Sequence, residues 1–124
     1  MNSIIDKRIV RTYKLYSESH PNKLIAILTI KDGLFESEGN INILDEDLAP
    51  IDLVLFNNKA NNINGVKAFL TDRAMPPNRM FFEEYCREHG YNHNDLNDRL
   101  KISGGKACGD DFYLVIEEKE ECIG

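Results

Sequence analysis

Apolar and polar positions alternate along the first half of the chain, a pattern typical of strands. In residues 9–17 (IVRTYKLYS), Ile9, Tyr13 and Leu15 alternate imperfectly with polar positions, which predicts a strand with one buried face near a sheet edge. Residues 24–30 (LIAILTI) are apolar at nearly every position and too few for a helix of ordinary length. They predict a central strand covered on both faces.

A hairpin and a fourth strand are predicted next. The Asp-Gly pair in KDGLF separates two apolar runs and favours a type I′ hairpin turn. Its second strand is then expected over residues 34–44, with Gly39 at a bulge. Residues 51–57 (IDLVLFN) predict a further strand, and the asparagine-rich residues 58–64 predict the connection from strands to helices.

The apolar period changes to that of a helix after this connection. In residues 65–74, Val66, Phe69 and Leu70 recur at three and four positions, which predicts a helix that ends before Pro76. Pro76 or Pro77 is expected to open a second helix.

That second helix contains NRMFFEEYCREH and is expected to end at Gly90. A third helix is expected to carry Leu96 and Leu100, with Asn92 as its N-cap. The run DFYLVIEE, residues 111–118, predicts a last strand that returns to the sheet before an acidic tail.

These elements predict one α+β domain over residues 1–124, with a sheet part in 1–57, a helical part in 60–103 and a closing strand in 111–118. A chain of 124 residues can close one thin core, so burial through self-association, as a dimer or higher, is expected. The strands are expected to be mostly antiparallel because the hairpin joins neighbours.

Net charge and cysteine use restrict the ligand class and the compartment. Fifteen Lys and Arg against 21 Asp and Glu give a net charge of −6, which disfavours duplex nucleic acid and anionic membranes. The start, MNSIIDKRIV, lacks the apolar region of a signal peptide, and no apolar run approaches a membrane span. Three cysteines favour free thiols in a reducing cytoplasm.

Enzyme signatures are absent from the sequence. GGKACGDD lacks the spacing of a phosphate-binding Walker loop and the Ser or Thr after its lysine, so a turn into the last strand is favoured over an anion loop. His89 and His93 stand four apart, but Gly90 lies between them, which disfavours a metal pair. Cys86 lies on an apolar helix face and is expected to be a packed thiol. We expect no catalysis, no metal and no cofactor.

The segment DRAMPPNRMFF carries the chemistry that remains. Arg73 and Arg79 flank a Pro-Pro corner ahead of a helix, a place that suits a phosphate. The alternative is surface pairing with neighbouring acids, namely Asp72, Glu83 or Glu84. Phe81 and Phe82 are about 100° apart on a helix, so we expect one to anchor the core and the other to lie at its margin, free to stack.

Asn92 has two interpretations: it can cap the third helix, or it can form hydrogen bonds with the edge of an adenine. Capping is favoured when the residue is considered by itself. Arginines, an aromatic ring and an amide within 20 residues, without a catalytic group, are suited to holding a nucleotide unchanged.

At these residues the chain resembles known small proteins. FLTDRAMPPNR, the amphipathic helix after it and GGKACGDDFYL are similar to the N-terminal segment of HipA-like kinase proteins of Gram-positive bacteria. As a free-standing chain with a sheet before its helices, the protein more closely resembles the Thoeris anti-defence sponge proteins of phages. The resemblance covers residues 66–115.

The sponge resemblance implies a non-enzymatic protein of the host cytoplasm that sequesters a cyclic ADP-ribose signal made by TIR-domain enzymes, in pockets between subunits. By this resemblance Phe82 stacks on the adenine and Asn92 reads its edge, while Arg79 and Arg73 hold the pyrophosphate. Asp111 and Tyr113 are motif neighbours that could reach a ribose.

Two other functions stay open. One is a protein-interaction module of the toxin–antitoxin or HipA-associated type, and the other is a hydrolase of the same nucleotide. A sponge predicts Phe82 partly exposed in a cleft, whereas an interaction module predicts it buried or on an open convex patch.

Overall fold

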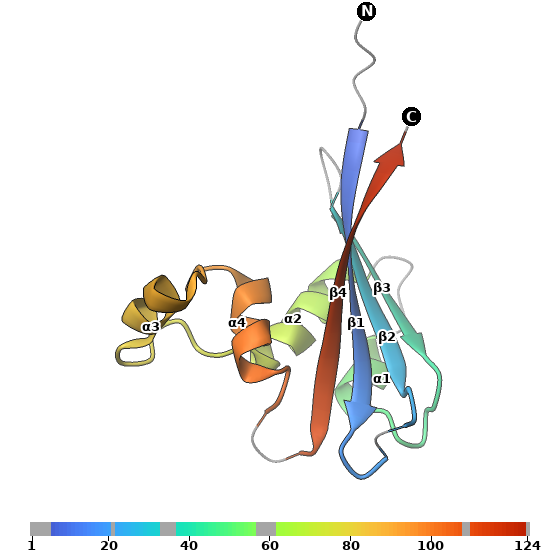
Figure 1. Ribbon diagram of the computed structural model, residues 1–124. Coiled ribbons are helices and arrows are strands. Elements are labelled where there is room, and N and C mark those ends of the chain that lie inside the picture. Colours follow the sequence, from blue (N-terminus) through green and yellow to red (C-terminus); the bar gives the residue numbers. More distant parts are fainter. Residues whose placement is uncertain (1–5, 21, 33–36, 57–61, 108–109, 124) are drawn as a thin grey trace, which may run out of the picture.

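The computed structural model describes residues 6–20, 22–32, 37–56, 62–107 and 110–123. Four strands and four helices are present within these ranges (Figure 1). In chain order they are β1 (Asp6–Ser17), β2 (Ala26–Asp32), β3 (Ser37–Ile43), α1 (Ile51–Phe56), α2 (Ile63–Arg73), α3 (Phe82–His89), α4 (Leu96–Ser103) and β4 (Phe112–Ile123). The α+β class is confirmed.

The four strands form one antiparallel sheet with the order β3-β2-β1-β4. The hairpin of β2 and β3 is confirmed, although its turn lies outside the described residues. β1 is an interior strand, so its predicted position near an edge is wrong. The reason is that β4 pairs along all of β1, from Asp6 opposite Ile123 to Ser17 opposite Phe112. The two strands are about a hundred residues apart in the chain, so the local pattern does not reveal this pairing.

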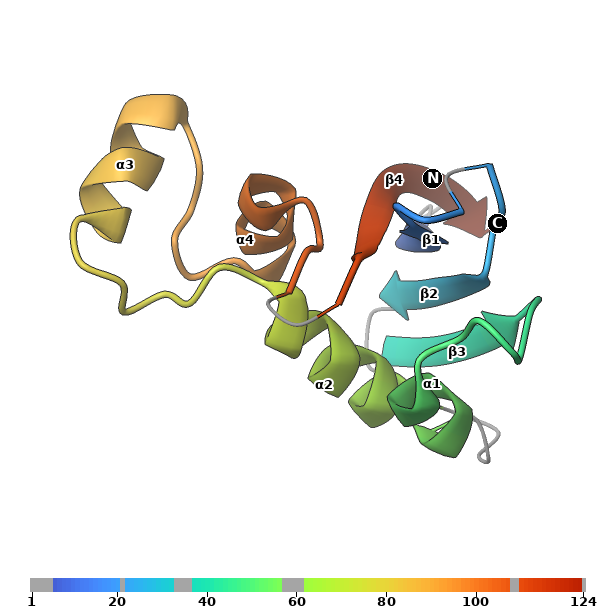
Figure 2. The same ribbon diagram turned by 90° about the horizontal axis from the view of Figure 1, so that it is seen from below.

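One face of the sheet carries the core, and α1, α2 and α4 lie on that side (Figure 2). β2 buries alternate residues rather than both faces, which corrects the expectation of two-sided cover. The core joins strand and helix residues, including Tyr13, Leu15, Leu28, Ile41, Leu53, Val66, Phe69, Leu70, Leu100 and Leu114. Burial of such side chains contributes about 1.5–3 kcal/mol each.

Residues 51–56 form helix α1 instead of the predicted strand. The carbonyl of Pro50 accepts hydrogen bonds from the amides of Leu53 and Val54, at 3.1 and 3.3 Å, and Asp52 lies in the first turn. Proline and an acidic first turn both favour a helix start. Because a mostly apolar stretch of six residues fits a helix or a strand equally well, the pattern alone could not decide.

Gly39 is not at a bulge. The register between β2 and β3 is continuous from Ala26 opposite Ile43 to Asp32 opposite Ser37. Instead, a Cβ atom at Gly39 would lie 2.5 Å from the Cα atom of Ile63. Glycine at this position therefore allows the start of α2 to cross directly over β3.

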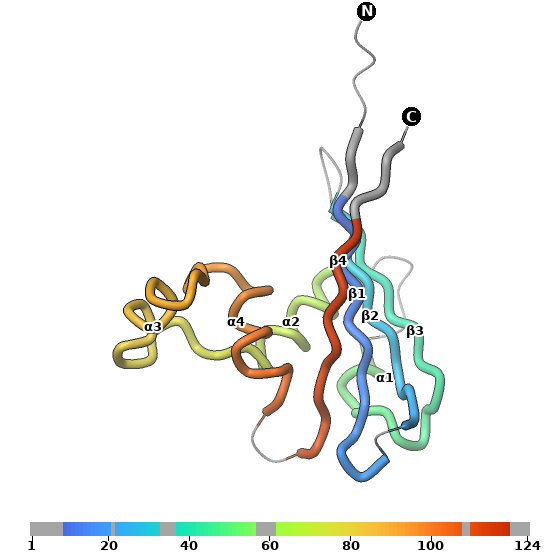
Figure 3. Tube along the Cα trace, in the orientation of Figure 1, coloured from blue at the N-terminus to red at the C-terminus, as the bar shows by residue number. Residues whose placement is uncertain are grey.

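α3 lies on an arm that leaves the body of the domain. We define the arm as residues 75–95, which run out from α2 and return to α4 (Figure 3). Both ribbon views place α3 on the far side of α4 from the sheet. The helix begins at Phe82, not at Pro76 or Pro77, and it ends as predicted at Gly90, whose φ is 78°. Within the described residues, no helix has the length and apolarity to cross a membrane.

Candidate functional site

Arg73, at the end of α2, binds residues of the turn that connects α4 to β4. The guanidinium is buried (5% exposed), donates to the carbonyls of Gly105 and Phe112 at 3.1 and 3.4 Å, and pairs with Asp110. It also lies 4.9 and 5.5 Å from the ring centroids of Phe69 and Phe112. Arg73, which we expected to bind a phosphate, thus binds acceptors of the protein itself. Its carboxylate partner is Asp110, and not Asp72 as the alternative of surface pairing required.

Arg79 and Phe82 meet at a hollow on the arm. Arg79 is exposed, and its Nη1 lies 3.3 Å from the Sδ of Met75; within the described ranges it makes no ion pair with a carboxylate. Phe82 is only 5% exposed, whereas Phe81 is 71% exposed. One phenylalanine is anchored and one is free, as predicted, but the free ring belongs to Phe81 and not to Phe82, the ring that we expected to stack.

The backbone explains why Phe81 is the exposed ring. Phe81 has φ 63° and ψ 6°, a left-handed conformation, immediately before the first turn of α3. It is the single non-glycine residue with positive φ among those described. Such a conformation costs a bulky residue about 1–2 kcal/mol. The strained residue is thus also the one whose ring is exposed to solvent.

The hollow beside Phe81 has a volume of about 370 Å³. Its lining is mostly apolar and comes from the arm and from α4: Met75, Arg79, Met80, Phe81, Phe82, Tyr85 and Ile102. Met80 and Tyr85 are exposed like Phe81; we call these three side chains the arm face. Concave, mostly apolar sites of this size with one or two polar groups hold ligands or protein anchors.

Asn92 lies away from the hollow lining and organises the return of the arm. Its side-chain oxygen accepts a hydrogen bond from the amide of Asn94 at 3.0 Å, and its own amide donates to Asp98 at 2.9 Å. The N-cap of α4 is Asp95, which accepts from the amide of Asp98 at 3.3 Å. The predicted capping role of Asn92 is therefore wrong, because an Asx-type turn precedes the cap.

Asp111 immediately precedes β4, and Tyr113 lies in β4. Asp111 accepts hydrogen bonds from Ser19 and from Ser17, and these bonds, first from Ser19 and then from Ser17, hold the pKa of Asp111 below its usual range. Tyr113 stacks on Tyr16 with centroids 5.6 Å apart. The register places this pair on the open face of the sheet, because Leu114 points into the core. The six predicted residues thus do not converge on one pocket of a single chain.

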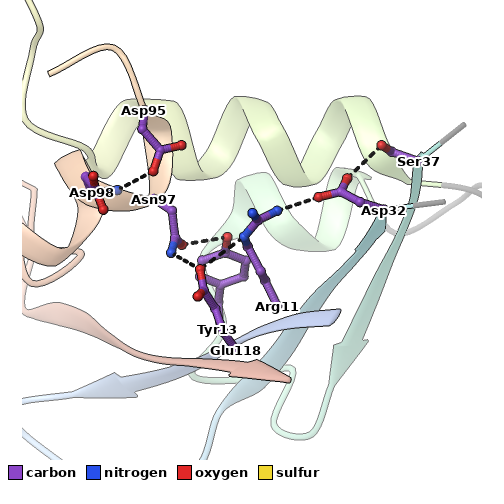
Figure 4. Close-up of polar contacts among 8 residues, drawn as sticks. All are labelled: Arg11, Tyr13, Asp32, Ser37, Asp95, Asn97, Asp98 and Glu118. Carbon is purple, nitrogen blue, oxygen red and sulfur yellow. Dashed lines mark hydrogen bonds and ion pairs between the residues drawn. The ribbon is translucent and has the colours of Figure 1, made fainter. Parts of the chain in front are cut away.

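A polar cluster that sequence analysis did not identify fixes α4 to the sheet (Figure 4). Arg11 of β1 pairs with Asp32 of β2 and, at 3.2 Å, with Glu118 of β4. Buried Asn97 of α4 donates to Glu118 at 2.6 Å and accepts from the hydroxyl of Tyr13 at 3.0 Å. Arg11, Asn97 and Glu118 each fit an exposed position when taken alone, so only the strand register could have signalled the cluster.

Tyr13 makes this cluster sensitive to alkali. Burial, opposed by Arg11, raises the pKa of Tyr13 from 10.0 to about 12, so between these values the folded state binds a proton that the unfolded state has lost. Stability should fall as pH rises from about 10 to 12. We expect Tyr13→Phe to flatten this loss in denaturant titrations and to remove a phenol transition near pH 12 from the absorbance at 295 nm. An unchanged absorbance titration would contradict this assignment.

The base of the arm is tied to α4 by three hydrogen bonds. The amide of Met75 donates to the carbonyl of Arg99 at 3.3 Å, and Arg99 Nη1 donates back to the carbonyl of Met75 at 3.4 Å. Ser103 donates to the carbonyl of Arg73 at 2.7 Å. Because α4 is itself fixed by Asn97, the arm leaves the domain in a defined direction.

The described residues offer no metal centre, since no group of three or more His, Cys, Asp or Glu side chains gathers among them. His89 stacks on Tyr85, with centroids 4.1 Å apart. Cys86 is buried, and burial raises the pKa of its thiol, which favours a packed thiol over a nucleophile, as the sequence predicts. Comparison of the chain with protein-family models, with curated proteins and with solved structures finds no match.

Proposed function

We propose that this protein is a non-enzymatic interaction module that binds another protein through the arm. The observation that carries the proposal is the exposed arm face, with Phe81 held in a left-handed conformation beside the hollow. Strained backbone conformations cluster at functional sites, so this residue supports a binding role for the arm. A protruding apolar surface next to a concave one is typical of a protein interface. The buried position of Phe82 also fits this function.

The composition of the arm face suits recognition of a protein. Aromatic residues, methionine and arginine are enriched at interface cores, and the arm supplies all three in Tyr85, Met80 and Arg79. Methionines adapt their shape to a partner side chain. Arg79, free of carboxylate partners within the described part of the chain, can pair with a partner carboxylate at the rim. We therefore expect a partner with an apolar anchor next to an acidic residue.

A photo-crosslinking amino acid at position 81 tests this function. We expect it to yield a discrete protein adduct in extracts of the source organism, whereas the same group at Val115, exposed on the open sheet face, should not. With the captured partner purified, Phe81→Ala and Tyr85→Ala should each weaken binding about tenfold or more, because aromatic anchors dominate interface energies. Equal adducts at both positions, or an unchanged Kd for Phe81→Ala, would contradict the proposal.

A second candidate is the sequestration of a cyclic ADP-ribose-type nucleotide, which would block Thoeris signalling. It is supported by Arg79 and two exposed rings around a hollow of about 370 Å³, which is within the usual 300–1,000 Å³ of small-molecule sites. In this candidate Phe81 and Tyr85 stack on the base while Arg79 binds the pyrophosphate. A second subunit would close the pocket.

Mass spectrometry separates the two candidates. The protein is purified after co-expression with an active TIR-domain enzyme, and bound small molecules are released by heat. Stoichiometric recovery of an intact cyclic nucleotide from wild type but not from Arg79→Ala favours the sponge. A cleaved nucleotide would instead favour a hydrolase, and no release with silent calorimetry leaves the protein-interaction module.

A further inference from the structure

The arm carries a projecting ring and a hollow on the same surface. The ring of Phe81 is 71% exposed, and it borders the apolar hollow of about 370 Å³. Phe81 also lines a second, more polar hollow of about 410 Å³, together with Arg79 and Glu84. An apolar knob, a hole and two opposite charges therefore lie close together in one short segment of the chain.

The two charges lack ionic partners. Within the described residues, neither Arg79 nor Glu84 forms an ion pair, whereas Glu83 pairs with Arg87 at 3.5 Å. Both unpaired side chains are exposed. The arm is expected to bind an apolar anchor next to an acidic residue, and the arm itself presents this combination in Phe81 and Glu84.

α3 obtains little stability from packing within its own chain. It has eight residues, of which Phe82 and Cys86 are buried and the other six are exposed. An isolated helix of fewer than about 12 residues is marginal in water, so α3 depends on packing for its stability. Tyr85 follows Phe81 by about one helical turn and is exposed like it. A second arm that packed here would cover both rings.

The position of the arm permits two copies to meet. The arm leaves the body of the domain, and α3 lies on the far side of α4 from the sheet (Figures 1 and 2). Contact between two arms therefore does not require the two sheets to approach each other. Contacts around a two-fold axis are reciprocal, so the ring of each copy can enter the hollow of the other. Pockets of about 300 Å³ or more hold whole small molecules, so an aromatic ring fits.

We infer that the partner of the arm is a second copy of the same arm: Phe81 fills the hollow of the other copy, and Glu84 beside it pairs with Arg79 of that copy. The inference rests on the proposed function, because it names the occupant of the same site. It accounts for an exposed ring and an apolar hollow on one surface, with an unpaired acid and an unpaired base beside them. Because the arm is small, the dimer is expected to be weak, with a Kd of about 1–100 µM.

Sedimentation velocity over about 1–100 µM tests the dimer. Phe81→Asn removes the ring, and asparagine tolerates the left-handed conformation of this position. Val115→Asn is the matched change of an exposed apolar residue on the open sheet face. We expect wild type and Val115→Asn to dimerise alike, and Phe81→Asn to dimerise about tenfold more weakly or less. Urea unfolding at low concentration should show no loss of stability for Phe81→Asn, which separates the loss of the dimer from a loss of the fold.

Mixing two charge variants tests the reciprocal contact. Arg79→Glu places two carboxylates at each contact and Glu84→Arg places two cations there, so each variant alone should dimerise about tenfold more weakly than wild type. In the mixture, both contacts of a heterodimer again join one carboxylate and one cation, and association should recover to within about threefold of wild type. Glu88→Arg is the matched control, because Glu88 is exposed on α3 but lines neither hollow. It should not restore association with Arg79→Glu.

A photo-crosslinking group at position 81 of the purified protein locates the contact. We expect an adduct of twice the chain mass, joined at a residue that lines the hollow of the second copy, such as Met75 or Ile102. A dimer joined elsewhere, a dimer that Phe81→Asn leaves unchanged, or charge variants that fail to associate when mixed would each overturn the inference.

The same crosslinker separates this inference from the proposed function. A wild-type protein that is monomeric at about 100 µM excludes the dimer, but if position 81 then crosslinks to a different protein in extracts, the proposed function stands without it. A monomeric protein that yields no adduct at position 81, either alone or in extracts, would count against both.

Discussion

Replacing Arg73 by methionine is expected to lower the free energy of unfolding by about 3 kcal/mol. The substitution removes the donor that satisfies the carbonyl of Gly105 at 3.1 Å and leaves Asp110 without its cation. Asp110 is partly exposed, so water recovers part of the lost ion-pair energy, and most of the cost comes from the buried carbonyl groups. Urea unfolding followed by circular dichroism measures the change.

Arg73→Lys is the matched control for Arg73→Met. It retains the positive charge but not the planar group that lies near the rings of Phe69 and Phe112, so an intermediate loss is expected. Asp110→Asn should cost less than Arg73→Met because its side chain is partly exposed. A methionine variant within about 0.5 kcal/mol of wild type would show that the guanidinium does not hold the turn.

The second large effect is expected for Gly39→Ala, at about 2 kcal/mol. The added Cβ atom would lie 2.5 and 2.7 Å from the Cα and N atoms of Ile63 and 3.0 Å from the carbonyl carbon of Asn62. Because these are backbone atoms, no rotamer change relieves the overlap, and α2 must move away from β3. Urea unfolding measures the loss.

Asn40→Ala is the control for Gly39→Ala, since Asn40 is the next residue of β3 and its side chain is exposed. A change within about 0.5 kcal/mol is expected there. If Gly39→Ala proved equally mild, the start of α2 would have to be displaced easily, and the close crossing would have no energetic weight.

Strand positions were predictable from sequence where the signal is local. The alternation of Tyr13 and Leu15, the apolar run of β2 and the Asp-Gly hairpin each act over a few residues, and all three strands are confirmed. The neighbours of β1 were not predictable in the same way, because its second partner is β4. Gly39 was misread for a similar reason: glycine indicates a special backbone position, but not whether a bulge or a close crossing requires it.

The candidate site was predictable in composition but not in geometry. The segment around Arg79 and the two phenylalanines does form the hollow, and the division into one anchored ring and one free ring follows from helical spacing. The order of the two rings depends on where α3 starts, and the left-handed Phe81 shifts that start beyond the prolines. Arg73 illustrates a second limit, since its partners Gly105 and Asp110 come from a turn over 30 residues away.

The pairing of β1 with β4 has a consequence for folding order. Residues 6–17 and 112–123 meet along their full length, so this closure carries the largest loop entropy in the sheet and should come late. The arm, whose contacts are local, can form first. During synthesis β1 therefore lies beside the β2–β3 hairpin with one side of its backbone unpaired. That side is a template for strand addition until β4 has been made and pairs with it.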